Sequence, residues 1–231
     1  PLHSSAASDV YKRQGFNVIF HYNSSESEAY EIQNSLNDIR ENSCFILQAD
    51  FNDKSSIERL SEGVSKITQE LAVLINNASS FYPTPLKDAS MDEWNDLMAT
   101  NATTPLFLTK VLLPFLRNGK GSVINISDTL APSGIKNFSL YSGAKSALEG
   151  ITKSLAKELA PEIRVNAISP GAILWPEDED LSEEQQKQRL TKVPLGRIGR
   201  PEDISSLALF LSDAEYITGQ VIKVDGGRSI I

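Results

Sequence analysis

The stretch G-S-V-I-N-I-S-D-T-L-A-P-S-G-I-K-N-F-S-L-Y-S-G-A-K, residues 121–145, decides how this chain is expected to fold. Its first seven residues form a short apolar run that predicts a buried strand. Residues 140–160 then predict a helix, so Asp128 follows the strand directly and Tyr141 lies on the helix. Because ligands of open α/β sheets bind at the carboxyl ends of the strands, we expect a ligand site at this transition.

Tyr141 and Lys145 are four residues apart in the predicted helix and therefore share one of its faces. A free phenol has a pKa of about 10, which is too high for easy proton exchange at neutral pH. A nearby ammonium group favours the phenolate, so we expect Lys145 to lower the pKa of Tyr141. The pair is then a general acid able to protonate a carbonyl or imine as hydride arrives.

The combination of Asp128, Tyr141 and Lys145 resembles the catalytic stretch of the short-chain dehydrogenases/reductases. Most members of that superfamily carry Ser at the position of Asp128, and Asp is a feature of its pteridine reductase branch. The similarity runs from about Gly15 to Gly227. It implies an α/β, Rossmann-like fold with a doubly wound, mostly parallel sheet. It also implies NADPH-dependent reduction of a dihydropterin of the biopterin, monapterin or dihydrofolate type. Tyr141 would donate the proton, Asp128 would orient the pterin or Tyr141, and Lys145 would hold the nicotinamide ribose.

Residues 1–14 lack the features with which a dinucleotide-binding fold begins. Such a fold starts with a buried strand, a Gly-rich turn and a helix whose N-terminus receives the pyrophosphate. In the family the turn reads T-G-x-x-x-G-x-G, whereas residues 1–14 contain no glycine. We expect a leader foreign to the fold, disordered or artefactual, and then a single domain at 15–231 without the usual first strand and helix.

The end of the predicted strand at 15–22 favours NADPH over NADH. NAD-selective enzymes place a carboxylate at the end of this strand to bind the ribose diol, and the sequence has none there. His21, Asn23, Ser24 and Ser25 offer hydrogen-bond donors that suit a 2′-phosphate. A Ser/Asn cap of the following helix is compatible with that role.

Further cofactor contacts follow from the resemblance. It implies that Asp50 meets the adenine ring; the alternative role of Asp50 is to cap the predicted helix at 54–69. The residues that the family places around the rest of the cofactor are Asn77 and Ala78, which follow the apolar run at 71–75, and Ser79, Ser127, Tyr141, Lys145, Pro170 and Gly171.

Residues 79–86, S-S-F-Y-P-T-P-L, resemble the pteridine reductase version of the segment after N-N-A, where most relatives have Gly. A flat heterocycle is well held between a nicotinamide and an aromatic ring, because offset stacking adds to burial. Phe81 is the candidate for that ring, and Ser79 can bond the pterin edge or the cofactor phosphates. Trp175 is a candidate for the wall of the pterin pocket, with simple packing as the alternative.

A capping box, S-x-x-E beginning at Ser90, predicts the start of a long helix that reaches about Arg117. Asn101 lies within it at the position of the family's catalytic-site Asn, whose backbone distortion supports a water relay to Lys145. Pro105 gives a physical reason for a kink at that point. Long helices build the subunit interfaces of this family, so the resemblance also implies a homotetramer.

The composition limits the possible partners. The 231 residues carry a formal net charge of −8, which argues against nucleic acid because that partner requires a basic face. The single Cys44 excludes an internal disulfide and suits a reducing cytosol. No apolar run approaches the ~20 residues of a membrane span. We expect a cytoplasmic enzyme that acts on a small molecule and holds no metal.

Two other functions fit the sequence. One is a carbonyl reductase of the 3-oxoacyl-thioester type, which shares the Tyr/Lys chemistry but is disfavoured by Asp128 and by residues 79–86. The other is a truncated, non-catalytic fragment that is unable to bind cofactor, and the missing Gly-rich turn supports it. Without that turn, several charge-assisted contacts to the pyrophosphate are lost, each worth about 1.5–3 kcal/mol.

Overall fold

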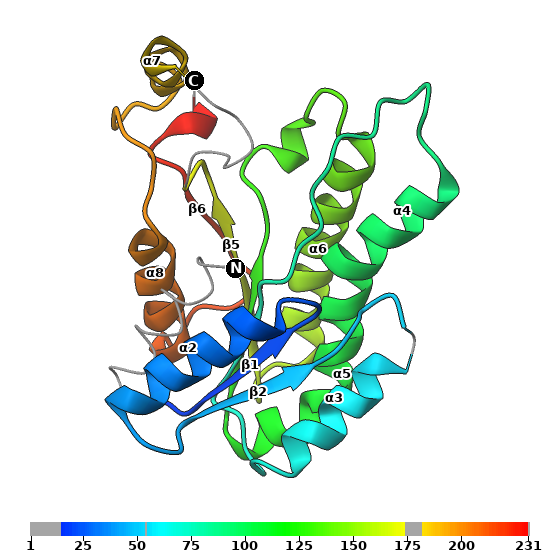
Figure 1. Cartoon of the computed structure of the whole chain (residues 1–231), viewed down its shortest axis with the longest axis vertical. Helices are drawn as coiled ribbons and strands as arrows, with labels where there is room; N and C mark the ends of the chain where they lie inside the picture. The colour runs from blue at the N-terminus through cyan, green and yellow to red at the C-terminus, as the bar shows by residue number, and fades with distance from the viewer. Residues whose placement is uncertain (1–14, 54, 174–181, 231) are drawn as a thin grey trace.

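A computed structural model describes residues 15–53, 55–173 and 182–230, in which strands alternate with helices (Figure 1). The expected leader at 1–14 and Trp175 lie outside these residues. None of the helices described there has the length and apolarity needed to cross a membrane. The elements are β1 (Val18–Tyr22), α2 (Glu26–Ile39), β2 (Cys44–Gln48), α3 (Ser56–Ser65), β3 (Val73–Asn76), α4 (Met91–Met98), the π-helical turn η1 (Ala99–Thr103), α5 (Thr104–Asn118), β4 (Ser122–Ile126), η2 (Ala131–Ser133), α6 (Ser139–Glu158), β5 (Arg164–Pro170), α7 (Glu183–Leu190), α8 (Pro201–Asp213), β6 (Val221–Val224) and η3 (Arg228–Ile230).

Within the described residues the strands form two sheets. β1 pairs with β2, and β3, β4, β5 and β6 pair in that order. Every one of these pairs is parallel, which confirms the predicted α/β architecture with a parallel sheet. Parallel pairing brings the carboxyl ends of β3, β4 and β5 to one edge, where the predicted ligand site lies.

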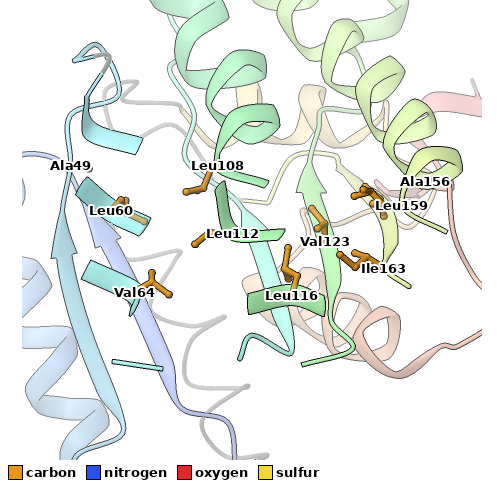
Figure 2. Close-up of a cluster of buried hydrophobic side chains, with 11 residues drawn as sticks. Ala49, Leu60, Val64, Leu108, Leu112, Leu116, Val123, Ala156, Leu159 and Ile163 are labelled. Atoms are coloured by element: carbon orange, nitrogen blue, oxygen red, sulfur yellow. The ribbon is translucent and has the colours of Figure 1, made fainter. Parts of the chain in front are cut away.

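Helices cover both faces of the four-stranded sheet. α3, α5 and α6 contribute to a core cluster on one face (Figure 2), and α8 covers the other face. Val123 of β4 packs in the first cluster, whereas its neighbour Ile124 packs with Ala208 and Leu211 of α8. Successive side chains of a strand point to opposite faces, so a strand covered on both sides is apolar at most positions. This explains the continuous apolar runs in the sequence.

A chain of buried hydrogen bonds joins β3, β4 and α6. The side-chain amide of Asn76 donates to Asn125 Oδ1 at 2.8 Å, and Asn125 Nδ2 donates to Thr152 Oγ1 at 2.9 Å. Thr152 in turn donates to the carbonyl of Leu148 at 2.8 Å. Asn125 and Thr152 are at most 1% exposed, so water cannot replace these partners. The chain of bonds therefore holds α6, which carries Tyr141 and Lys145, against the ends of two strands.

Replacing Thr152 by Val should lower the free energy of unfolding by about 1–3 kcal/mol, because the buried amide of Asn125 loses its acceptor while side-chain volume is nearly kept. Urea unfolding followed by circular dichroism measures this. Thr84→Val is the matched control, since Thr84 is also buried and its hydroxyl has no hydrogen-bond partner within the described residues. Thr84→Val should leave stability unchanged or raise it. Equal losses for the two variants would contradict the role of the amide chain.

Candidate active site

The predicted catalytic residues come together at the carboxyl edge of the four-stranded sheet. Asp128 lies two residues after the end of β4, and Ser79 lies three residues after the end of β3. Tyr141 is in the first turn of α6, and Lys145 follows one turn later. Asn101 lies in η1, between α4 and α5, and reaches Ser79. Segments that are distant in the sequence therefore surround one point.

The carboxylate of Asp128 is oriented by backbone and accepts from Tyr141. Its Oδ1 atom accepts from the amides of Leu130 at 2.7 Å and Ala131 at 3.2 Å. Its Oδ2 atom accepts from the Tyr141 hydroxyl at 3.1 Å. The local turn after β4 thus fixes one carboxylate oxygen, and the other is directed at the phenol. Both a proton donor and a strong hydrogen-bond acceptor face the same ligand-binding edge.

The pKa of Tyr141 is shifted in the direction opposite to the sequence-based expectation. Burial of the phenol raises its pKa well above 10, and the negative charge of Asp128 raises it further. Lys145 does not offset this, because its Nζ atom lies 5.9 Å from the centroid of the Tyr141 ring, whereas the Asp128 carboxylate contacts the hydroxyl. The expectation that Lys145 lowers the pKa of Tyr141 is therefore wrong.

Lys145 is a buried cation whose charge is supported by a backbone carbonyl. Its Nζ atom donates to the carbonyl oxygen of Ile126, the last residue of β4, at 2.8 Å. The side chain is 2% exposed. Burial lowers the pKa of Lys145 to about 8, and the nearby Asp128 carboxylate partly opposes that shift. Lys145 therefore titrates close to the physiological range, where a proton can be exchanged.

Asn101 and Ser79 form a polar link to Tyr141. The Ser79 hydroxyl donates to Asn101 Oδ1 at 2.7 Å and also contacts the Tyr141 hydroxyl. The Asn101 amide donates to the carbonyls of Leu97 at 3.0 Å and Ser80 at 2.9 Å, so its orientation is determined on both sides. This structure directs the Ser79 hydroxyl at Asn101, a contact that the sequence did not predict.

The predicted helix from Ser90 to about Arg117 exists, with a distortion around Asn101. The capping box at Ser90 is present. Residues 99–103 form one turn of π-helix between α4 and α5, and Pro105 occupies the first turn of α5. Pro105 has no amide hydrogen, so a regular helix could not continue its hydrogen bonds through this point. The predicted distortion is confirmed, and it places Asn101 with its side chain fully buried.

Aromatic side chains surround the mouth of the site. Phe81 stacks on Phe138 with a centroid distance of 4.5 Å and meets the Tyr141 ring edge-on at 4.8 Å. Phe81 remains 57% exposed, so it retains a face for a flat ligand. Phe138 was not among the predicted site residues. It immediately precedes α6, and only the fold brings it onto Phe81.

Of the residues near β1 that were predicted to bind the 2′-phosphate, His21 is not placed to do so, whereas Asn23, Ser24 and Ser25 are. His21 is directed away from a phosphate site, because its Nε2 atom lies 2.8 Å from the carbonyl oxygen of Ala49 and its ring stacks on Phe51 at 4.3 Å. Burial lowers the pKa of His21, which disfavours the imidazolium that an anion would need. Asn23 and Ser24 are exposed, and Ser25 precedes α2 without a side-chain cap bond. These three residues remain at a helix N-terminus, where anions are favoured.

Asp50 does not cap α3, which was its alternative role. Its Oδ1 atom accepts from the amide of Asn52 at 2.9 Å in the turn after β2. The turn before α3 is held instead by Asp53, which accepts from the amide and hydroxyl of Ser55 at 2.9 Å each. The helix itself is shorter than predicted, Ser56–Ser65.

The remaining predicted cofactor residues lie at the ends of β3, β4 and β5. Asn77 and Ala78 are exposed immediately after β3, and Ser127 follows β4 with its hydroxyl donating to Glu149 Oε1 at 2.8 Å. Glu149 was not predicted as a site residue. It lies eight residues after Tyr141, on the face of α6 that carries Tyr141 and Lys145, and this helical spacing could have identified it from the sequence.

Pro170 and Gly171 are held by the last turn of the chain. The Gly171 amide donates to the carbonyl of Val224 at 2.9 Å, and a side chain at Gly171 would come within 2.7 Å of Asp225 Cα. Asp225 accepts from the Thr129 hydroxyl at 3.0 Å, which ties this turn to the residue beside Asp128.

Across the described part of the chain, no group of three or more His, Cys, Asp or Glu side chains could hold a metal ion.

The lowered pKa of Lys145 predicts a measurable pH dependence of stability. Between pH 8 and 10.5 the unfolded chain binds more protons than the folded chain, so the free energy of unfolding rises with pH in that window. Relative to Lys145→Met, the unmodified protein should gain about 1–2 kcal/mol of stability between pH 7 and 9.5. Urea unfolding at several pH values measures the difference. Lys153→Met, at an exposed position of α6, is the control, and parallel profiles for all three proteins would contradict the burial of a charged amine.

Comparisons with known proteins identify the family to which this chain belongs. The model of the family described as enoyl-(acyl carrier protein) reductase matches residues 4–229. An uncharacterized oxidoreductase of Bacillus subtilis is 31% identical over 224 residues, covering 95% of this chain and 91% of the relative. Pteridine reductase 1 of Leishmania tarentolae is 34% identical over 269 residues, covering 98% and 92%. A 3-oxoacyl-(acyl carrier protein) reductase of Thermotoga maritima is 35% identical over 180 residues, covering 75% and 73%. With its Tyr141 and Lys145 on one helix beside the end of β4, this chain belongs to the short-chain dehydrogenase/reductase superfamily of oxidoreductases.

Proposed function

We propose that this protein is an NADPH-dependent reductase of a dihydropterin or related folate-type ring. The observation that carries the proposal is the pair formed by the Asp128 carboxylate and the Tyr141 hydroxyl, 3.1 Å apart, beside the partly exposed ring of Phe81. A pteridine reductase among the relatives supports the same assignment.

The substrate class follows from the chemistry of the two recognition elements. Phe81 offers a face on which a flat, electron-rich ring can stack. Phe138 stacks on Phe81 and holds the Phe81 ring in place. Asp128 offers a carboxylate that can accept hydrogen bonds from the N–H groups of a pterin. The 3-oxoacyl chain of a thioester has neither a ring to stack nor N–H groups, so this pair favours the heterocycle.

The residues at the carboxyl edge fit the nicotinamide end of a dinucleotide. Lys145 keeps one backbone partner and has hydrogens left for ribose hydroxyls, while Asn77, Ser127 and Gly171 lie at the ends of adjacent strands. Asn23, Ser24 and Ser25 fit a 2′-phosphate, which favours NADPH. The bound nicotinamide supplies the hydride that reduces a C=N bond.

Tyr141 supplies the proton that completes the reduction. Its raised pKa keeps the phenol protonated through neutral pH, so the proton is held at Oη until negative charge develops on the ring nitrogen. Asp128 orients that hydroxyl through its Oδ2 atom. The Ser79 hydroxyl contacts Tyr141 and donates to Asn101 Oδ1, so it helps to hold the position of the phenol.

The proposal includes a cytoplasmic homotetramer. The described surface carries apolar side chains on the long helices that the family uses for its interfaces: Met91 at the start of α4 is 70% exposed and Phe107 on α5 is 43% exposed. We expect the subunit contacts of the proposed tetramer to lie on α4 and α5, around these two side chains.

Tyr141→Phe should reduce turnover of a dihydropterin by about 10²–10⁴-fold, because the general acid is removed. Asp128→Ser should reduce kcat/KM for the pterin by about 10–100-fold, since a charge-assisted hydrogen bond is lost. Rates of NADPH consumption with a dihydropterin and with a β-ketoacyl thioester measure both effects. If Tyr141→Phe and the Asp128 variant both retain full pterin turnover, the proposal is wrong.

The same assay decides between the proposal and its alternatives. Relatives named as 3-oxoacyl-(acyl carrier protein) reductases favour a carbonyl reductase as the second candidate, and faster turnover of the thioester than of the pterin would select it. NADPH fluorescence titration of the unmodified chain is the control for cofactor binding. An absence of binding would select the non-catalytic alternative.

Phe81→Ala should raise KM for the pterin by about 3–10-fold with a smaller effect on kcat, because stacking of aromatic rings contributes about 0.5–1.5 kcal/mol beyond burial. Phe210→Ala is the matched control, since Phe210 is 58% exposed on α8 and should leave KM unchanged. Steady-state kinetics with varied pterin at saturating NADPH measures both variants. Equal KM values for the two variants would remove Phe81 from the substrate site.

A further inference from the structure

The segment that carries Phe81 is anchored to the protein on both sides of this residue. Before it, the Ser80 hydroxyl donates to Thr100 Oγ1 at 3.2 Å. After it, the Tyr82 hydroxyl donates to Asp96 Oδ2 at 2.7 Å. The segment itself belongs to no helix or strand, so no ladder of backbone bonds holds it in place. The position of the Phe81 ring therefore depends on the bonds of its two neighbours.

Asp96 lies on α4, and its carboxylate is held from two directions. Its Oδ2 atom accepts from Tyr82, and its Oδ1 atom accepts from the side-chain amide of Asn52 at 3.2 Å. Asn52 belongs to the turn after β2, where its backbone amide donates to Asp50 Oδ1 at 2.9 Å. One carboxylate thus joins three segments: the turn after β2, the segment after β3, and α4. Because both of its oxygens accept a bond, the carboxylate offers Tyr82 an acceptor in a fixed orientation.

Tyr82 is suited to be an anchor because both parts of its side chain are held. Its ring packs against the buried cluster of Leu97, Ala131 and Tyr141. Burial and, after it, the hydrogen bond to Asp96 raise the pKa of Tyr82 to about 12, so its hydroxyl remains a donor at neutral pH. The carbonyl oxygen of Glu93 lies 3.4 Å from the same hydroxyl, a longer and weaker contact. The short bond to a charged acceptor is therefore the stronger one.

A backbone bond closes the segment two residues after Tyr82. The amide of Thr84 donates to the carbonyl of Asn137 at 2.6 Å, two residues before α6 begins. Between these attachments, the Phe81 ring meets the Tyr141 ring edge-on with a centroid distance of 4.8 Å. The Thr84 amide therefore reports whether the segment around Phe81 stays closed on the start of α6.

We propose that Tyr82 and Asp96 are positioning residues that fix the Phe81 ring beside Tyr141 and thereby set the affinity for the flat ring of the substrate. The identity of that substrate comes from the proposed function, on which this inference rests. Stacking requires two rings in a set relative orientation, so a ring that is already fixed binds the heterocycle without first losing freedom of movement. Tyr82 and Asp96 act through Phe81 and bind no substrate atom themselves.

Hydrogen exchange of the full chain tests the anchor itself, without cofactor, substrate or turnover. Tyr82→Phe removes one oxygen atom and keeps the ring. Exchange of the Thr84 amide should become about 3–10-fold faster, because its bond to Asn137 opens more often once the anchor is lost. Tyr216→Phe is the matched control, since Tyr216 is fully exposed and should leave this exchange unchanged. Circular dichroism shows whether both variants are folded.

Steady-state kinetics with a dihydropterin and NADPH tests the link to Phe81. Tyr82→Phe should raise KM for the pterin about 2–5-fold with little change in kcat, because Tyr141 and Lys145 stay in place. Asp96→Ala should act in the same direction, and the double variant should be no worse than Tyr82→Phe, since both changes remove one bond. When Phe81→Ala is already present, Tyr82→Phe should not raise KM further. A merely structural role would lower kcat and would add to the effect of Phe81→Ala.

Three results would overturn the proposal. The first is unchanged exchange of the Thr84 amide in Tyr82→Phe, and the second is an unchanged KM in Tyr82→Phe when Phe81→Ala raises it. The third is an equal rise of KM on Tyr82→Phe with and without the Phe81 ring. The second and third results leave the proposed function intact. Absence of pterin turnover by the unmodified chain would overturn the proposed function instead, and exchange at Thr84 would then decide by itself whether Tyr82 holds the segment.

Discussion

The buried amide of Asn125 is the interaction on which the geometry of the site depends. It accepts from Asn76 of β3 and donates to Thr152 of α6, so that two strands and the catalytic helix are joined by short hydrogen bonds in a dry interior. A buried polar group must find its partners within the protein, which leaves few alternative positions for these elements. The phenol of Tyr141 and the amine of Lys145 are carried to the end of β4 as a consequence.

Burial shifts the pKa values of these two groups in opposite directions. Removal from water disfavours the charged form of each, so the pKa of the phenol rises and the pKa of the amine falls to about 8. Asp128 adds to the first effect and opposes the second, because a carboxylate favours a neutral phenol and a charged amine. The result is a protonated phenol that is held by a carboxylate and lies near a cation with an accessible pKa.

Most of the secondary structure was predictable because its signals are local. The apolar run at 121–127 gave β4, the S-x-x-E box at Ser90 gave the start of α4, and Pro105 marked the π-helical distortion around Asn101. The boundaries of α3 were predicted less well, since Asp53 and Ser55 form the turn at its start and the sequence around them has several polar residues that could begin a helix. Spacing along α6 also placed Tyr141 and Lys145 on one face, as a helix requires.

The sequence by itself determined the alternation of strands and helices and the chemical identity of Asp128, Tyr141 and Lys145, because periodicity and spacing depend only on neighbouring residues. Only the tertiary structure decided the direction in which the pKa of Tyr141 shifts, the stacking of Phe138 on Phe81, and the turn of His21 toward Ala49. Each of these depends on burial, or on contacts between segments that are far apart in the chain, and no local pattern encodes the distance between such segments.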